Sequence, residues 1–328
     1  MKANTFRTEI ACPSTHTIGL KDLILTTGSC FADQFGQWLQ NNKFDVLVNP
    51  YGTNYNPVSI HKSLIESVSL ELDERLFIEQ QRLWHHFDYH SQWSSTQKED
   101  LKTSIQKIEL QVNQYMKKLD VLIITYGSAW VYQHKGLDCI VSNCHKVPAG
   151  EFNKRLLSVG EITQSFNQLY SVIKSIRPEI RILLTVSPVR HIKDTLVLNS
   201  VSKATLRLAC HSLSNHYESV EYFPSFEIMM DDLRDYRFYD RDKIHPTEEA
   251  LDYISHKFSD QYFKPDVKSF IEKWHTIRQA MEHRAYHPQS EAHQHFLKEL
   301  LHKLEELKEV VSVDEEIKTI QSQIHTNA

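Results

Sequence analysis

Five short apolar segments along the chain predict β-strands. Residues 121–125 (VLIIT) and 182–186 (ILLTV) are dense in Val, Ile and Leu, without alternation between apolar and polar positions. That pattern is typical of strands buried on both faces of a parallel sheet. The remaining predicted strands are shorter or more mixed in composition: residues 23–26, 44–48 and 221–226.

Helical patterns of apolar residues lie between these segments. The predicted helices cover residues 31–41, 101–119, 161–176, 200–217 and 247–263. Strands that alternate with helices imply βαβ units, in which each helix returns the chain to a parallel neighbouring strand. The sequence therefore predicts an α/β fold with a five-stranded, mainly parallel, doubly wound sheet.

Residues 128–142 interrupt this alternation. Two short apolar stretches, 129–132 and 137–141, flank the sequence HKG at 134–136. This arrangement predicts a β-hairpin inserted after the third strand. Because binding residues are often carried by loops on a rigid scaffold, we expect the insertion to border a substrate pocket.

The composition changes after residue 263, and residues 264–328 are rich in Glu, Lys, His and Gln. Apolar residues here are spaced three and four positions apart: Leu297, Leu300, Leu304, Leu307 and Val311. The spacing predicts a helix with a narrow apolar seam, and two heptads are too few to indicate a coiled coil. We expect the seam to pack back on the core, with a homodimer through the C-terminal helices as the alternative. The expected division is an α/β domain over 1–265 and a helical extension over 266–328.

Charge and composition exclude several classes of protein. A net charge of -5 over 328 residues argues against a nucleic-acid partner, which would require a basic surface. No apolar run approaches the ~20 residues that span a bilayer, and the N-terminus lacks the apolar region of a signal peptide. The five cysteines are scattered along the chain, and no two of them have CxxC spacing. We therefore expect neither a disulfide framework nor a zinc site. We expect a cytoplasmic protein without a membrane partner.

Two short segments carry the residue types that a hydrolase needs. Residues 28–30 (GSC) end the first predicted strand, and Asp242 lies three positions before His245. A nucleophile, a base that takes its proton and an acid that orients the base together allow nucleophilic catalysis. Taken alone, the first segment would be a turn with a helix cap, and the second a capping acid beside a surface imidazole. Polar residues also follow the third and fourth strands, at 127–129 and 187–191, and this convergence at one sheet edge indicates an enzyme.

Residues 28–32 read GSCFA, which is the signature of the GSCFA family. The chain resembles that family at further segments: residues 49–57, 125–130, 143–146 and 187–190. The GSCFA family in turn resembles a branch of the SGNH (GDSL-like) hydrolases, which are three-layer α/β/α esterases and acyl-transfer enzymes. The resemblance implies an acyl esterase or O-acyltransferase of that fold, which works through a covalent acyl-enzyme and needs no cofactor.

This resemblance assigns roles to individual residues. An ungapped register with the superfamily's Gly-Asp-Ser motif places Cys30 at the nucleophile position, whereas the superfamily's serine chemistry points to Ser29. Cys30 is favoured, because a thiol at a helix N-terminus near a histidine would have a lowered pKa, and Ser29 is then expected to cap the helix. Asp242 would orient His245, which acts as general base and then as general acid. Gly52 would donate a backbone N–H to the oxyanion.

The third motif departs from the superfamily pattern. Gly127 is followed by Ser128 and Ala129 where the superfamily has Gly-x-Asn, so a side-chain donor to the oxyanion is missing. Such a donor stabilises the transition state by about 3–4 kcal/mol. Loop residues that could replace it are Asn54, Asn56 and Asn143.

Other residues near the predicted edge are candidates for substrate contact. Arg190 and His191 follow the fourth strand and suit an anionic group, with an ion pair to Asp194 as the alternative for Arg190. For His145, substrate contact and loop packing are equally weighted. The HEXXH spacing of zinc sites is absent, and we predict no metal. The remaining histidines of note are expected at the surface: His85, His86, His90, His283, His287, His293 and His295.

The sequence is compatible with three functions. The leading one is an ester hydrolase or acyltransferase for a small-molecule or carbohydrate ester, in which water or another hydroxyl takes the acyl group. The second is a non-catalytic module that binds carbohydrate or acyl groups on the same fold, and Ala129 favours it if no asparagine reaches the site. The third is a scaffold protein in which the helical tail is the functional element.

Overall fold

A parallel sheet of five strands forms the centre of the protein, in a computed structural model that describes residues 8, 10 and 14–324. The strands lie in the order β10–β9–β5–β1–β2. Their bounds are β1 Ile24–Gly28, β2 Val46–Val48, β5 Val121–Tyr126, β9 Arg181–Val186 and β10 Val220–Phe223. Numbered along the chain, this is the 2-1-3-4-5 order of flavodoxin-like doubly wound sheets. The predicted α/β fold class and its five parallel strands are confirmed.

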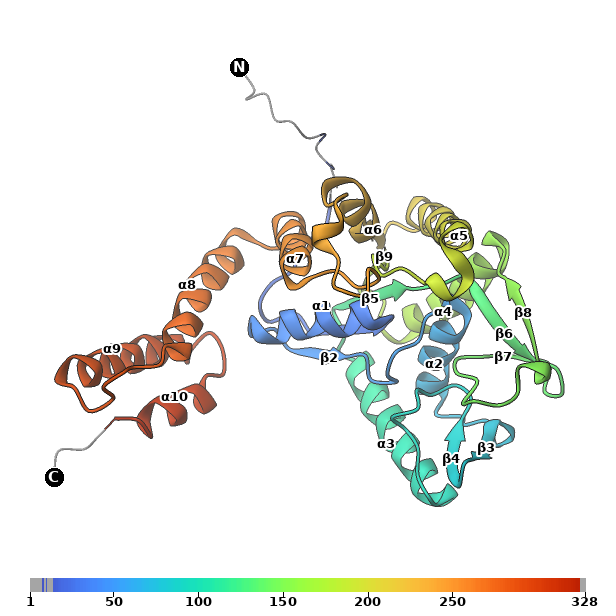
Figure 1. The fold of residues 1–328 in the computed structure, drawn as a ribbon, viewed down its shortest axis with the longest axis horizontal. Helices are drawn as coiled ribbons and strands as arrows, with labels where there is room; N and C mark the ends of the chain where they lie inside the picture. Colours follow the sequence, from blue (N-terminus) through green and yellow to red (C-terminus); the bar gives the residue numbers. More distant parts are fainter. Residues whose placement is uncertain (1–7, 9, 11–13, 325–328) are drawn as a thin grey trace.

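Helices cover both faces of this sheet (Figure 1). They are α1 Cys30–Asn41, α2 Pro57–Ser69, α3 Lys98–Met116, α4 Val159–Ile176, α5 Thr195–His216, the short α6 Ser225–Glu227, and α7 Glu248–Tyr262. The sequence predicted α1, α3, α4, α5 and α7 to within a few residues, and it missed α2. The side chains that α2 buries include Ser59, His61, Ser63 and Ser67, so its apolar periodicity is weak.

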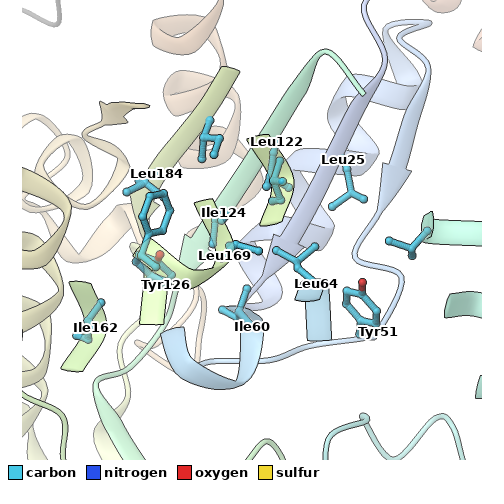
Figure 2. Close-up of a cluster of buried hydrophobic side chains, with 14 of the residues drawn as sticks. Leu25, Tyr51, Ile60, Leu64, Leu122, Ile124, Tyr126, Ile162, Leu169 and Leu184 are labelled. Carbon is cyan, nitrogen blue, oxygen red and sulfur yellow. The ribbon is translucent and has the colours of Figure 1, made fainter. Parts of the chain in front are cut away.

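Alternate side chains of the central strands enter two separate cores. On one face, Leu25, Leu122 and Leu184 pack with side chains from α2 to α5 (Figure 2). On the other face, Ile24 and Ile123 pack with side chains of α1 and α7. Both faces of β5 are therefore covered, and every residue of this strand is buried. This double burial explains the uninterrupted apolar run in the sequence.

Two small antiparallel sheets are inserted at the edge of the α/β fold. One pairs β3 Phe77–Gln80 with β4 Leu83–His86. The other has the order β7–β6–β8, from β6 Trp130–His134, β7 Cys139–Val141 and β8 Phe152–Leu156. The predicted hairpin is the β6–β7 pair and is confirmed. β3, β4 and β8 were not predicted, because each is a short segment of mixed polarity.

As far as residue 324, the C-terminal segment forms three helices, which lie to one side of the α/β fold (Figure 1). Their bounds are α8 Pro265–Glu282, α9 Glu291–Leu307 and α10 Asp314–Gln321. The predicted apolar seam lies on α9 except for Val311, which follows the end of that helix. The seam packs against α8 and α10, rather than against the α/β core as expected. Trp274 Nε1 donates to Asn41 O at 2.7 Å and Lys43 pairs with Glu316 at 2.6 Å, which ties these helices to α1. A homodimer through them stays a prediction.

None of the described helices combines the length and the apolarity that are needed to span a lipid bilayer.

Candidate active site

The predicted nucleophile turn, residues 28–30, lies at the C-terminal end of β1, beside the central strand β5. Gly28 pairs with Thr125 and has a φ of +132°, and a Cβ at this position would lie 2.1 Å from Thr125 O. Only glycine fits this turn without a shift of the backbone. The Ser29 hydroxyl accepts a hydrogen bond from Phe31 N at 3.3 Å, and α1 begins at Cys30. The prediction that Ser29 caps α1 is confirmed.

The Cys30 thiol is partly buried at the first turn of α1. Burial raises its pKa, and the neighbouring Asp33 carboxylate raises it further. The positive charge of Lys203 and the backbone N–H groups of Cys30 and Phe31 lower the pKa, but their effect is smaller. The expectation of a lowered pKa at this helix N-terminus is therefore wrong, because desolvation outweighs the helix end.

The proposed acid and base form a hydrogen-bonded pair on the loop before α7. His245 Nδ1 and Asp242 Oδ2 are 2.6 Å apart, as the spacing of these residues predicts. Asp242 Oδ1 also accepts hydrogen bonds from the backbone N–H groups of Ile244 and His245. These bonds, above all the one to the imidazole, lower the pKa of Asp242 to about 2. The carboxylate is thus ionised and positioned to orient the ring.

Arg190 ties this loop to the end of β9. Its backbone N–H donates to Ile244 O at 3.2 Å, and its Nη1 donates to Lys243 O at 3.3 Å. The guanidinium also lies 3.8 Å from the centre of the Tyr239 ring. Asp194 pairs with Lys154 instead, so the expected ion pair with Arg190 is wrong, and the expected anion site stays a prediction. Arg190 holds the His245 loop at the carboxyl edge of the sheet.

The structure brings the two predicted catalytic segments, residues 28–30 and 242–245, to the same edge of the sheet. No hydrogen bond joins the Cys30 thiol to His245 in the part of the chain that the structure describes. His245 lies near His191 and helps to lower its pKa, after the larger effects of burial and Lys203. The His191 ring in turn meets the Tyr55 ring edge to face at 4.9 Å between centroids, and Tyr55 is close enough to Cys30 to interact with it electrostatically. His191 and Tyr55 therefore form a series of neighbouring side chains between His245 and Cys30.

Most of the expected oxyanion donors have other partners. The Gly52 N–H donates to Asn49 O at 2.8 Å within a turn, and Gly52 itself has a φ of +77°. Its predicted role as an oxyanion donor is corrected to that of a turn residue. The Gly127 N–H likewise donates to Tyr55 O, at 2.8 Å. Asn56 caps α2 by accepting from Ser59 N at 2.8 Å.

Asn54 differs from the other candidate asparagines. Its side chain is 3% exposed, and within the described residues neither its amide nitrogen nor its amide oxygen has a hydrogen-bond partner. Its backbone N–H donates to Gly28 O at 2.8 Å, which places it beside the nucleophile turn. An unpaired buried amide destabilises a fold by about 1–3 kcal/mol. Of the three candidate asparagines, Asn54 is thus the one whose side-chain amide has no partner among the described residues.

The remaining candidates belong to a separate cluster around the antiparallel insertions. His145 is buried, stacks on His85 at 4.5 Å and lies 2.9 Å from His86 O through its Nε2. Burial lowers the pKa of His145 to about 4. Asn143 accepts from His145 N and donates to Ser91 Oγ. These contacts support loop packing for His145 and Asn143, and they correct the surface position expected of His86, which is fully buried.

The described residues contain no group of three or more His, Cys, Asp or Glu side chains arranged to hold a metal ion.

Lys203 is a residue of this site that the sequence analysis missed. It lies on the buried face of α5 and is 1% exposed. Its Nζ donates to Gly127 O at 2.9 Å and to Ser187 O at 2.7 Å, at the ends of β5 and β9. Burial lowers its pKa to about 7, and the nearby Cys30 opposes that effect. The sequence contained one indication of its burial. The apolar spacing of the predicted helix over residues 200–217 places Lys203 on the buried face of that helix.

Comparison with known proteins identifies the family of both parts of the chain. The GSCFA family profile matches residues 23–258, and the profile of the GSCFA domain protein C-terminal domain matches residues 274–326. A comparison with curated proteins found no match.

Two solved structures show distant likeness. One is a Streptococcus pneumonia protein provisionally described as a platelet activating factor, with a TM-score of 0.40, 12% identity, and coverage of 74% of this chain and 84% of that chain. The other is a carbohydrate esterase family 3 protein from Talaromyces cellulolyticus, with a TM-score of 0.32, 11% identity, and coverage of 77% and 98%. At these identities and TM-scores, the likeness says nothing about the function of this chain.

Proposed function

The chain belongs to the GSCFA family, and from that premise and the geometry of the site we propose that it is an ester hydrolase or acyltransferase. The acyl group is carried on Cys30. The observation that carries the proposal is the Asp242–His245 pair, 2.6 Å apart, on a loop held at the same sheet edge as Cys30. In an open sheet of this order, ligands bind at that edge, next to the switch point between β1 and β5.

The proposed reaction has two steps. In the first, Cys30 Sγ attacks the ester carbonyl carbon, its proton passes to His245 Nε2, and the alcohol leaves with that proton as the C–O bond breaks. In the second, water or another hydroxyl gives a proton to Nε2 and attacks the thioester. The C–S bond then breaks, and the thiol regains its proton. Asp242 keeps the other ring proton on Nδ1 throughout, which leaves Nε2 as the base.

The two catalytic segments must close on one another for this reaction. His245 has a side chain that is 40% exposed, and Nε2 has no hydrogen-bond partner within the described residues. Catalytic hydrogen bonds are often absent in unliganded proteins and form in the substrate complex. Small-molecule and carbohydrate esters are the proposed substrates, since the imidazole is open to solvent.

Trapping the acyl-enzyme tests this function. We expect incubation with p-nitrophenyl acetate, followed by acid quenching, to leave one acetyl group on the peptide that contains Cys30, as measured by mass spectrometry. The group should disappear on treatment with hydroxylamine, which cleaves thioesters. Peptides with Cys139 and Cys144, which are partly buried elsewhere, serve as internal controls. Absence of any acyl group, together with absence of turnover for acetylated sugars, would favour the binding module.

Asn54 is the proposed side-chain donor to the oxyanion. It would take the role of the asparagine that the superfamily has at the position of Ala129. We expect Asn54→Ala to lower kcat by about 10²–10³, without the loss of a protein hydrogen bond, because the amide makes none. Asn56→Ala is the matched control. It removes a helix cap and should lower the free energy of unfolding by about 1 kcal/mol, with kcat unchanged for the folded protein. Equal kcat values for wild type and Asn54→Ala would remove Asn54 from the mechanism.

A further inference from the structure

The side chain of Asn49 continues the pairing of β1 at the point where the backbone of β2 turns away. The parallel ladder between the two strands runs as far as the pair Thr26–Val48, and Asn49 N donates to Thr26 O at 2.8 Å. The chain then turns, with a φ of +39° at Asn49. The next residue, Pro50, has no backbone N–H to donate. Regular pairing to Gly28 from this side of β1 therefore stops at Asn49.

The Asn49 amide takes the place of the missing strand residue. Its Oδ1 accepts from Gly28 N at 3.0 Å, and its Nδ2 donates to Gly28 O at 3.3 Å. Nδ2 also donates to Asp33 Oδ2 at 3.0 Å. A side-chain amide has the same donor and acceptor groups as a peptide unit. One asparagine can therefore bond both the N–H and the C=O of Gly28, and it does so while only 3% exposed.

Three elements thus meet at Gly28. Thr125 of β5 pairs with it in the ladder on one side, and Asn49 bonds it on the other side. α1 contributes Asp33, whose carboxylate accepts from the Asn49 amide. Since Gly28 precedes Cys30 by two residues, the orientation of its peptide groups sets the start of α1 and the direction of the thiol.

We propose that Asn49 is a positioning residue, whose amide fixes the nucleophile turn against the end of β2 and so directs the Cys30 thiol at the ester carbonyl. This inference rests on the proposed function for its effect on turnover. Gly28 has a φ of +132°, and glycine adopts many other backbone conformations at little cost. Without the Asn49 amide, the Gly28 N–H loses the acceptor that holds it in this one. Misplacement of a reacting group by about 1 Å can lower a rate by about 10²-fold.

The acetylation rate of Cys30 in Asn49→Ala tests this role. The rate is measured by quenched-flow mass spectrometry over a range of p-nitrophenyl acetate concentrations. We expect the maximal rate to fall by about 10²-fold, while the half-saturating ester concentration stays within about twofold, because a displaced nucleophile slows the reaction without changing ground-state binding. Equal maximal rates in wild type and Asn49→Ala would overturn the proposal.

Asn113→Ala is the matched control. Asn113 is a buried asparagine of α3, whose Nδ2 donates to Ser67 O at 3.0 Å and to Val68 O at 3.2 Å. Its replacement also removes two buried hydrogen bonds, and it should destabilise the protein while the folded fraction keeps the wild-type acetylation rate. An equal loss of rate in both variants would show that Asn49 acts only through stability, which would also overturn the proposal.

Amide hydrogen exchange tests the same contact without any ester. In Asn49→Ala, the peptide that contains residues 28–30 should exchange at least about 10-fold faster than in wild type, because the turn opens more readily. Asn113→Ala should leave that exchange unchanged. Wild-type exchange of this peptide in Asn49→Ala would overturn the role of Asn49 whatever the activity. By contrast, absence of acetylation in wild type would count against the proposed function alone.

Asn49→Asp is the second variant, which keeps the proposal testable if Asn49→Ala fails to fold. Its carboxyl group keeps an acceptor oxygen for the turn, but it meets the Asp33 carboxylate where the amide donated. Two carboxylates so close together share one proton, and that proton supplies the donor hydrogen. The acetylation rate relative to wild type should therefore fall as the pH rises and the shared proton is lost.

The other ionisable groups near Asp33 are Cys30, Tyr55 and His90. They are present in wild type and in Asn49→Asp, so the ratio of the two rates reports on the introduced carboxyl group. A ratio that stays constant as the pH changes would overturn the positioning role of Asn49.

Discussion

Cys30→Ala is expected to abolish hydrolysis of p-nitrophenyl acetate, whereas Ser29→Ala should leave kcat in place and lower the free energy of unfolding by about 1 kcal/mol. The two residues are adjacent, and the structure separates their environments. The Ser29 hydroxyl is fully buried and accepts the Phe31 N–H as a helix cap. The Cys30 side chain is the one that retains partial exposure at the first turn of α1. Initial rates and urea unfolding of both variants provide the measurement.

Substitutions of the other half-buried thiols control for loss of a cysteine as such. Cys139 lies in the antiparallel insertion and Cys144 in the loop after it. Neither Cys139→Ser nor Cys144→Ser should change the rate of p-nitrophenyl acetate hydrolysis. The opposite pattern, an active Cys30→Ala and an inactive Ser29→Ala, would contradict thiol chemistry. It would also require the Ser29 side chain to leave its cap, since its hydroxyl cannot both cap α1 and attack an ester.

Asp242→Asn should lower kcat by about 10⁴, with a smaller change in KM. The carboxylate accepts the Nδ1 proton of His245 at 2.6 Å. An asparagine can present its amide N–H instead, which would move the ring proton to Nε2 and remove the base. Steady-state kinetics at fixed pH provide the measurement. Because the pKa of Asp242 is lowered to about 2, any loss of wild-type activity between pH 5 and 7 should come from another group.

Asp240→Asn is the matched control, because Asp240 is exposed on the same loop and makes its hydrogen bonds through its backbone. It changes the loop charge by the same amount and should leave kcat within a factor of about two, as expected of a surface substitution away from the chemistry. Similar losses in Asp240→Asn and Asp242→Asn would indicate a general effect of loop charge. Full activity of Asp242→Asn would exclude the Asp242–His245 pair from the mechanism.

Residues whose role depends on near neighbours in the chain could be predicted. The run VLIIT predicted β5 because a strand covered on both faces needs apolar side chains at every position. The capping of α1 by Ser29 is a bond to a residue two positions away. The bond between Asp242 and His245 spans three positions. In each case the chain brings the partners together by local geometry, so the spacing of the residues was enough.

Other features depended on contacts between distant segments. α2 was missed because it buries serine and histidine side chains, among them His61, whose Nε2 meets the Tyr126 hydroxyl of β5 at 2.6 Å. The sequence predicts that Gly52 donates to the oxyanion, whereas in the fold its N–H bonds Asn49 O. Among three candidate asparagines, only the folded structure distinguishes Asn54, since an unpaired amide is recognised by the absence of partners around it.

The sequence by itself predicted the five strands of the central sheet, five of the helices between them, the turn after β1, and the bond between Asp242 and His245, because periodicity and short-range hydrogen bonds are properties of neighbouring residues. The tertiary structure alone decided the electrostatics of the site. The pKa of Cys30 is raised rather than lowered because burial and Asp33 outweigh the helix end. Lys203 reaches that site from α5, through carbonyl groups at the ends of two other strands. Desolvation and long-range charge exist only once the chain has folded.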